Sequence, residues 1–221
     1  MLEVILTGDG SPSLLHQAFG LTYHSRHGAL QESRHVFIHN GLQYVANKFG
    51  PNISVFELGF GTGLNAALSA IEAQRLDRHI NYIGIDKYPL TESVYGQLPF
   101  ENVFSGNDLQ LTKRILTAPW HLTQNISPYF NLEKIEVDIL NFQHVSQYHV
   151  VYFDAFDPEA QPSLWQRTIF EKLFKALHAG GVLVTYCAKG KVKRLLRDIG
   201  FEVQTLNGPP GKREMTRAIK P

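Results

Sequence analysis

A glycine-rich loop follows an apolar stretch in the first third of the chain. The sequence reads Val55-Phe56-Glu57-Leu58-Gly59-Phe60-Gly61-Thr62-Gly63, which spaces the glycines as G-x-G-x-G. A glycine loop between a strand and a helix lets the backbone approach a ligand closely and leaves amide donors at the start of the helix. Leu64 stands where a dinucleotide fold has its last glycine. This departure, with an acid two residues before the first glycine, favours S-adenosylmethionine over a dinucleotide. We predict that the cofactor-binding residues here are Glu57, Gly59, Phe60, Gly61 and Gly63.

Aspartates stand at the ends of three predicted strands beyond this loop. Asp86 comes about 20 residues after the glycines, where a carboxylate can accept hydrogen bonds from ribose hydroxyls. Asp138 ends a later strand and is expected to face the adenine amine. Taken singly, each could instead cap a helix or turn. Because the positions recur at successive strand ends, we predict that Asp86 and Asp138 also bind the cofactor.

Asp154 ends the fourth strand of the pattern and is the candidate catalytic residue. Methyl transfer needs a nucleophile with a free lone pair aimed at the methyl carbon. An alkyl amine with a pKa near the lysine value of about 10 is protonated at neutral pH, so a carboxylate that accepts its proton helps. The structural alternative is that Asp154 orients its loop or caps the helix after it. Phe156 and Tyr186 could flank a planar base by stacking, or belong to the core.

Strands alternate with helices over most of the chain. Strands are predicted at 53–57, 81–85, 134–137, 150–153 and 182–186, and a closing hairpin at 201–206 and 214–219. Helices are predicted at 64–76, after Pro89, at 163–177 with Gly180 and Gly181 as its stop, and at 189–199. The alternation predicts an α/β, Rossmann-like class I methyltransferase fold, with a mainly parallel seven-stranded sheet that ends in an antiparallel β-hairpin.

The chain has 221 residues and 43% hydrophobic residues, which suits one main core. We expect residues 1–50 to form an N-terminal extension packed on a methyltransferase domain at 51–221. No apolar run approaches the roughly 20 residues of a membrane helix, so we expect a cytoplasmic protein without membrane contact. Cys187 is the single cysteine, and His35 and His39 have no third ligand nearby, so we predict no metal site.

The net charge of +1 hides an uneven distribution. Residues 189–221 hold nine Lys and Arg against three acidic residues, whereas the rest of the chain is net negative. Such a segment can contact phosphates, although a solvated helix face and hairpin would also explain it. The candidate substrate-binding cations are Lys189, Lys212 and Arg213.

Several motifs together resemble the methyltransferase domain of the MnmC-type tRNA 5-methylaminomethyl-2-thiouridine biosynthesis proteins, in a form without their flavin oxidase domain. They are Asp9-Gly10-Ser11, Tyr23-His24-Ser25, Glu32-Ser33-Arg34-His35-Val36-Phe37-Ile38, the 57–63 loop, Asp154-Ala155-Phe156 with Trp165, and Lys212-Arg213-Glu214-Met215. The resemblance implies methyl transfer from S-adenosylmethionine to the 5-aminomethyl group of the wobble uridine in tRNA, with Asp154 near the amine. It also implies that another enzyme supplies this amine or that the tRNA already carries it. The two-domain proteins have the sequence Asp-Gly-Phe-Ala-Pro where this chain has Asp-Ala-Phe-Asp-Pro at 154–158, so Ala155 and Asp157 differ.

Two other functions fit parts of the pattern. A spermidine synthase type aminopropyltransferase shares the fold and an aspartate that faces an amine, but its polyamine site would need several acids. A non-catalytic cofactor-binding partner protein would keep the fold without turnover. Transfer from labelled S-adenosylmethionine to tRNA or to polyamines distinguishes the three. The sequence does not fix the oligomeric state.

Overall fold

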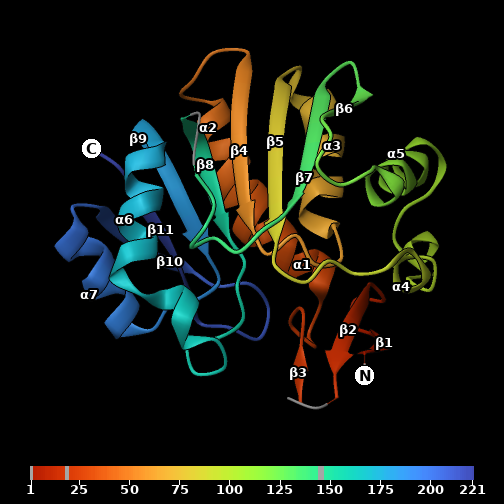
Figure 1. Cartoon of the computed structure of the whole chain (residues 1–221), viewed down its shortest axis with the longest axis horizontal. Helices are drawn as coiled ribbons and strands as arrows, with labels where there is room; N and C mark the ends of the chain where they lie inside the picture. Colours follow the sequence, from red (N-terminus) through yellow and green to blue (C-terminus); the bar gives the residue numbers. More distant parts are fainter. Residues whose placement is uncertain (1, 18–19, 144–146) are drawn as a thin grey trace.

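The structure is a computed structural model that describes residues 2–17, 20–143 and 147–221. Within these residues a central eight-stranded sheet has the order β10-β11-β9-β8-β4-β5-β7-β6 (Figure 1). Strands β5, β4, β8, β9 and β7 run parallel, and β11, β10 and β6 are antiparallel to their neighbours. The strands are β4 (Asn52–Leu58), β5 (His79–Asp86), β6 (Gln124–Ser127), β7 (Phe130–Glu136), β8 (Tyr148–Phe153), β9 (Leu177–Thr185), β10 (Glu202–Asn207) and β11 (Glu214–Ile219).

The order of strands places a crevice beside β4. The chain builds outward from β4 to β5 and β7, then returns to add β8 and β9 on the other side. Ligands of open α/β sheets bind at the carboxyl ends of the strands where this reversal occurs. The topology therefore locates a candidate site at the ends of β4 and β8.

Helices cover both faces of the sheet because strand residues alternate between two apolar cores. Val55, Tyr82 and Tyr152 pack with residues of α3 and η1, whereas Phe56, Val151 and Phe153 pack with α6 and α7. The helical elements are α1 (Ala29–Ser33), η1 (Arg34–Gln43, a π-helix), α2 (Tyr44–Ala46), α3 (Leu64–Leu76), α4 (Glu92–Tyr95), η2 (Phe100–Asn102), α5 (Gly106–Thr117), η3 (Pro162–Trp165), α6 (Arg167–Ala176) and α7 (Gly190–Ile199).

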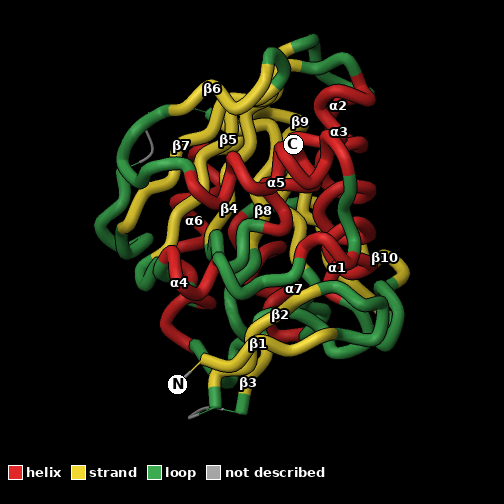
Figure 2. Tube along the Cα trace, turned by 90° about the vertical axis from the view of Figure 1, so that its right-hand side faces the viewer, coloured by secondary structure: helices red, strands yellow, loops and turns green. Residues whose placement is uncertain are grey.

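The first part of the chain forms a small antiparallel sheet of β1 (Leu2–Leu6), β2 (Pro12–His16) and β3 (Leu21–Thr22). Figures 1 and 2 show this sheet at the end of the molecule toward which the carboxyl ends of β4 and β5 point. Helix α1 follows it and lies beneath the central strands. The N-terminal residues therefore approach the candidate site from outside the main sheet.

The predicted fold class is confirmed, with differences at particular elements. All seven predicted strands are present; the eighth, β6, is polar and pairs with the sheet edge through a tight turn to β7, so no apolar alternation marked it. The helix predicted at 163–177 is split: Gln166 is extended, at φ −89° and ψ 156°. The indole of Trp165 donates to the Phe156 carbonyl and holds η3 apart from α6. Gly180 and Gly181 lie inside β9 and do not end a helix.

Candidate functional site

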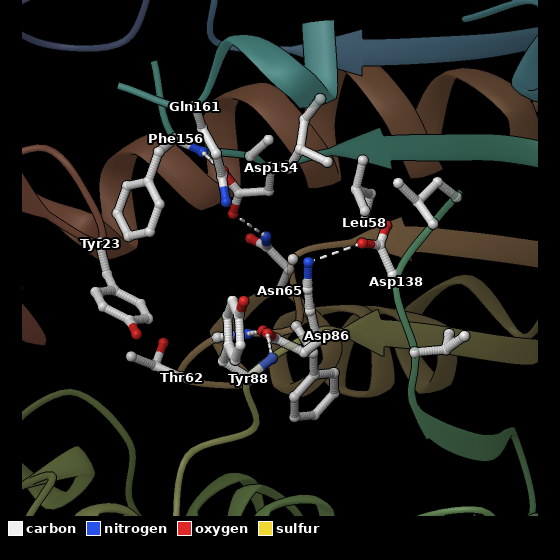
Figure 3. Close-up of a pocket in the computed structure, with 18 of the residues that line it drawn as sticks. Tyr23, Leu58, Thr62, Asn65, Asp86, Tyr88, Asp138, Asp154, Phe156 and Gln161 are labelled. Carbon is white, nitrogen blue, oxygen red and sulfur yellow. Dashed lines mark hydrogen bonds and ion pairs between the residues drawn. The ribbon is translucent and has the colours of Figure 1, made fainter. Parts of the chain in front are cut away.

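A pocket of about 290 Å³ opens at the carboxyl ends of β4, β5 and β8. Its walls come from the glycine loop, the end of β5, the segment after β7 and the loop after β8. Tyr23 and His24 of the N-terminal segment complete it. Figure 3 shows Asn65 and Asp154 between the aromatic rings of Tyr23 and Phe156 on one side and Asp138 on the other.

Gly59 brings the glycine loop against the loop after β8. Its φ is +92°, and a Cβ at this position would lie 2.5 Å from the Asp154 carbonyl oxygen. The amides of Gly59 and Phe60 both donate to the Ile85 carbonyl, at 3.0 and 3.1 Å. A side chain at residue 59 would therefore force apart the loops that form the pocket.

Asp86 holds two backbone segments at the floor of the pocket. Its Oδ2 accepts from the Gly61 amide at 3.0 Å, and its Oδ1 accepts from the Tyr88 amide at 2.9 Å. Burial raises the pKa of this carboxyl, and the backbone donors oppose that effect. Asp86 lines the pocket, as a residue that accepts from a ribose must.

Asp138 also lines the pocket, and its carboxylate already has partners. Oδ1 accepts from the Leu140 amide at 3.0 Å, and Oδ2 pairs with Lys87 Nζ at 2.9 Å. The Leu140 amide and Lys87 lower the pKa of Asp138. This residue therefore remains a carboxylate at neutral pH, placed at the end of the pocket away from Asp154 (Figure 3).

Asn65, in the first turn of α3, links two carboxyl groups. Its Nδ2 donates to Glu57 Oε1 and to Asp154 Oδ2, both at 2.8 Å. Glu57 is 1% exposed and lies behind the pocket wall, whereas Asp154 lines the pocket. An amide nitrogen has two protons, so one side chain can hold both carboxyls at once.

Burial makes Asp154 a much weaker acid than an exposed aspartate. Its pKa is raised to about 7, mainly by desolvation and also by the Glu32 charge, against the opposing effects of Asn65 and Lys212. Desolvation and the Asp154 charge raise the pKa of Glu57 well above its ordinary value. A carboxyl with a pKa near 7 can exchange a proton readily at neutral pH, as a general base must.

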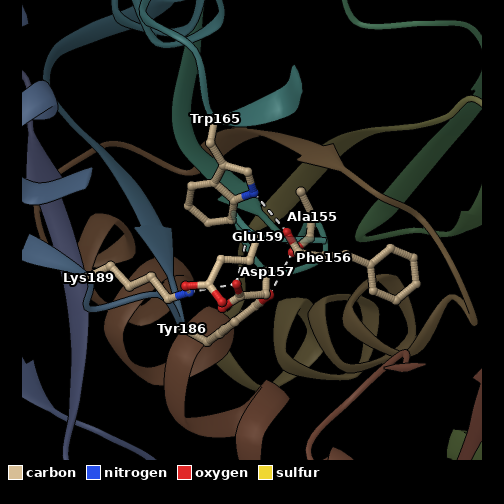
Figure 4. Close-up of polar contacts among 7 residues, drawn as sticks. All are labelled: Ala155, Phe156, Asp157, Glu159, Trp165, Tyr186 and Lys189. Atoms are coloured by element: carbon tan, nitrogen blue, oxygen red, sulfur yellow. Dashed lines mark hydrogen bonds and ion pairs between the residues drawn. The ribbon is translucent and has the colours of Figure 1, made fainter. Parts of the chain in front are cut away.

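The pair of aromatic residues at the pocket is Phe156 and Tyr23, whereas Phe156 and Tyr186 were expected to flank a base. The Phe156 ring contacts the Tyr23 ring edge to face, with centroids 5.2 Å apart, and both line the pocket. Tyr186 instead donates from its hydroxyl to the Ala155 carbonyl at 2.8 Å. Figure 4 shows Tyr186 with Trp165 and Lys189 around the 155–159 loop. Tyr186 thus supports the loop that carries Asp154.

The three candidate substrate-binding cations have different surroundings. Lys189 Nζ lies 2.7 Å from Asp157 Oδ1 and 2.7 Å from Glu159 Oε1 (Figure 4). Lys212 Nζ pairs with Glu32 and lies 3.8 Å from the centroid of the Tyr186 ring. Arg213 is exposed, and no carboxylate of the described residues forms an ion pair with it. Of the three, Arg213 presents its charge to solvent.

Two buried polar atoms at the pocket indicate that a ligand fits there. Thr62 Oγ1 and Asn65 Oδ1 have no hydrogen-bond partner in the described structure, and both residues line the pocket. Buried polar atoms are costly without a partner. Together with the glycine loop and the carboxylates of Asp86 and Asp138, which line the same pocket, they fit the polar groups of an adenosyl cofactor.

Four residues of the site did not follow from the predicted strand ends: Asn65, Tyr23, His24 and Glu32. Tyr23, His24 and Glu32 stand in motifs that carry the family resemblance. The sequence therefore singled them out but did not show that they lie at or beside the pocket. Asn65 has no such signal beyond its place one residue after the start of α3. Its contacts depend on how the loop after β8 meets the helix.

The described residues contain no group of three or more His, Cys, Asp or Glu side chains arranged to hold a metal ion. Nor does any helix in the described ranges have the length and apolar character needed to cross a membrane.

Comparisons with known proteins bear on the site. The sequence pattern of a family described as S-adenosyl-L-methionine-dependent methyltransferase matches residues 120–221. The tRNA 5-methylaminomethyl-2-thiouridine biosynthesis bifunctional protein MnmC of Chromobacterium violaceum is 30% identical over 220 residues, covering 94% of this chain and 33% of that protein. The protein of the same name from Pseudoalteromonas atlantica is 30% identical over 237 residues, covering 98% of this chain and 33% of that protein.

Among solved structures, MnmC2 from Aquifex aeolicus superposes with a TM-score of 0.80 at 24% identity, over 100% of this chain and 71% of that chain. This likeness supports the same fold over the whole chain. The chain spans about a third of the length of the curated relatives it matches.

Proposed function

We propose, from its similarity to the MnmC proteins, that this chain transfers a methyl group to the exocyclic amine of 5-aminomethyluridine at the wobble position of tRNA. The enzyme class is S-adenosyl-L-methionine-dependent methyltransferase, as the matching family description states. The acceptor and the tRNA are the proposed part, because the curated relatives are bifunctional proteins of which this chain spans about a third.

The observation that carries the proposal is the setting of Asp154. The carboxyl lines the pocket, accepts from Asn65 at 2.8 Å and has a pKa raised by burial to about 7. A primary alkyl amine arrives mostly as an ammonium ion, since lysine has a pKa of about 10.4. A carboxylate beside the acceptor can take up that proton and expose the lone pair.

S-adenosylmethionine supplies an electrophilic methyl group when bound. We propose that the glycine loop and Asp86 hold its ribose and methionine portions, and that Asp138 faces the adenine. Glu57 would act from behind the pocket wall, because it reaches the site through Asn65. Thr62 Oγ1 and Asn65 Oδ1 would gain partners from the bound molecule.

The chain's own groups would perform the remaining steps. Asp154 accepts a proton from the ammonium, and Asn65 keeps the carboxylate aimed at the amine. The freed lone pair would take the methyl group that the bound cofactor supplies, and the proton that the methylated amine then releases would go to solvent, because Asp154 already carries the first one. Phe156 and Tyr23, at the same end of the pocket as Asp154, would contact the uracil ring.

We propose that RNA phosphates contact the exposed cations of the C-terminal segment. Lys191 and Arg194 lie on the exposed face of α7, and Arg213 lies on the turn before β11. Lys189, Lys193 and Lys212 already pair with carboxylates of the chain. The exposed group would therefore provide most of the salt-dependent affinity. A separate enzyme that supplies the aminomethyl group is a proposed partner.

One assay tests the function. The protein is incubated with labelled S-adenosylmethionine and either tRNA bearing 5-aminomethyluridine or a polyamine, and the products are separated by nucleoside analysis. We expect label in 5-methylaminomethyluridine and none in the polyamine. Asp154→Asn should retain cofactor binding and lose turnover. Transfer to the polyamine would support an aminopropyltransferase-like acceptor site, and cofactor binding without transfer would support a non-catalytic role.

A further inference from the structure

The partly buried ion pair between Glu32 and Lys212 joins two segments that are distant in the sequence. Glu32 belongs to α1, and Lys212 to the turn between β10 and β11. The Glu32 side chain is 6% exposed and that of Lys212 is 30% exposed. Glu32 Oε1 also accepts from the Ser25 amide at 3.0 Å. The N-terminal segment and the C-terminal hairpin are therefore fastened to each other beside the pocket.

The N-terminal hairpin fixes the position of Glu32. The amides of Ala29, Leu30 and Gln31 at the start of α1 donate to Thr7 Oγ1, Ser11 Oγ and Asp9 Oδ2, at 3.0, 3.0 and 2.9 Å. These bonds satisfy the amides of the first helical turn, which have no hydrogen-bond partner within the helix. The Asp9-Gly10-Ser11 motif thus holds the helix from which Glu32 reaches Lys212.

Lys212 continues the connection to the catalytic loop. Its ammonium lies 3.8 Å from the centroid of the Tyr186 ring, and the Tyr186 hydroxyl donates to the Ala155 carbonyl at 2.8 Å. Ala155 directly follows Asp154. We propose that Glu32 and Lys212 are positioning residues for Asp154, acting as a clasp that holds Tyr186 and the loop after β8 and places one charge of each sign near its carboxyl.

The two charges act on Asp154 in opposite directions. Glu32 raises the pKa of Asp154, and Lys212 lowers it. The other titratable groups that interact with this carboxyl are Glu57 on β4, Tyr82 on β5 and Tyr186 after β9. His24 of the N-terminal segment lines the same pocket. The pKa of Glu57 and that of Tyr186 are raised by burial, and burial lowers that of His24 to about 4. The clasp therefore places a negative charge, Glu32, and a positive charge, Lys212, near Asp154, and the two have opposite effects on the pKa of Asp154.

This arrangement predicts that two variants shift the pKa of Asp154 in opposite directions. Lys212→Met leaves the Glu32 carboxylate and should move the titration of Asp154 to higher pH. Glu32→Gln leaves the Lys212 ammonium and should move it to lower pH. The double variant should return toward the wild type. A purely structural clasp would change stability without opposite displacements.

The titration of Asp154 can be followed directly by ¹³C NMR of protein labelled at the aspartate carboxyl, with Asp154→Asn for assignment. This measurement needs no substrate, so it tests the effect of the clasp on Asp154 independently of the proposed function. The role of the clasp in catalysis rests on the proposed function. Where the wild type methylates tRNA, the acidic limb of the kcat profile should move with the NMR midpoint. A limb displaced by one pH unit changes the rate below it about tenfold.

Lys193→Met is the matched control, because Lys193 Nζ lies 2.7 Å from Glu214 Oε2, next to the turn of the same hairpin. We expect it to alter stability and leave the Asp154 midpoint unchanged. If Lys212→Met does not fold, Lys212→Arg and the near-isosteric Glu32→Gln provide the comparison: arginine should preserve the midpoint and glutamine should lower it. Equal midpoints in all folded variants, or displacements of the same sign for Lys212→Met and Glu32→Gln, would overturn the proposal.

Discussion

Replacement of Asn65 by alanine should move the pH dependence of turnover because one side chain holds the candidate base. The variant removes the Nδ2 donor that lies 2.8 Å from Asp154 Oδ2. A hydrogen bond to a charged group contributes about 1.5–3 kcal/mol, and 1.36 kcal/mol corresponds to one pKa unit. Loss of the bond therefore raises the pKa of Asp154 from about 7 by roughly 1–2 pH units.

The expected rate at pH 7 follows from the ionised fraction. About half of Asp154 is ionised in the wild type at this pH, and roughly 1–10% in the variant, so kcat falls about five- to fiftyfold. Because the base is needed in its ionised form, activity should recover as the pH rises through the new pKa.

The assay is the kcat profile from pH 6 to about 9.5 at saturating cofactor and tRNA, a range chosen to include both the wild-type and the raised pKa. Ser69→Ala is the matched control: Ser69 lies on the same helix, is buried and bonds the Tyr152 hydroxyl at 3.1 Å, away from Asp154. Its acidic limb should not move. A loss of activity in Asn65→Ala that is equal at every pH would refute the reasoning, since it would show that Asn65 does not act through Asp154.

Four further changes test other parts of the site. Asp86→Asn should weaken S-adenosylmethionine binding about ten- to hundredfold in calorimetry, because a carboxylate that holds the glycine loop and is proposed to bind the ribose loses its charge. Gly59→Ala should lower both the melting temperature and the affinity for the cofactor, because its Cβ would meet the Asp154 carbonyl; an unchanged affinity would contradict the close approach of the two loops. Asp9→Ala should lower the free energy of unfolding in urea by about 1–2 kcal/mol, because the start of α1 loses its cap. Arg213→Gln should reduce the salt dependence of tRNA binding by about one charge and leave cofactor affinity unchanged. A salt dependence equal to that of the wild type would show that Arg213 does not contact the RNA.

The strand ends were predictable because their pattern is local. Asp86 and Asp154 each follow a short apolar run, and parallel strands bring such ends to one edge of a sheet. The glycine spacing fixed the start of α3 at Leu64, as predicted. These features need no information about how distant segments pack.

The environment of the predicted site residues was less predictable. The basic C-terminal segment was expected to offer Lys189 and Lys212 to a substrate, but their partners Asp157, Glu159 and Glu32 come from other parts of the chain. Sequence counts charges along the chain, whereas ion pairs depend on the folded arrangement. The partner of Phe156 is Tyr23 for the same reason: the N-terminal segment closes the pocket from outside the sheet.

The helix predicted at 163–177 shows a limit of periodicity. Its apolar spacing continues through Trp165, but the indole bond to Phe156 and the extended Gln166 separate η3 from α6. Leu177 then joins β9. A tertiary contact thus overrode a helical pattern that was locally consistent.

The most direct test of the central claim is the identity of the methyl acceptor. Wild-type protein and Asp154→Asn are incubated with S-adenosylmethionine and tRNA carrying 5-aminomethyluridine, and the wobble nucleoside is analysed by mass spectrometry. We predict that the wild type converts it to 5-methylaminomethyluridine and that Asp154→Asn binds the cofactor but leaves the nucleoside unchanged. An unmodified nucleoside with wild-type protein that binds both cofactor and tRNA would contradict the account, as would equal conversion by the two proteins.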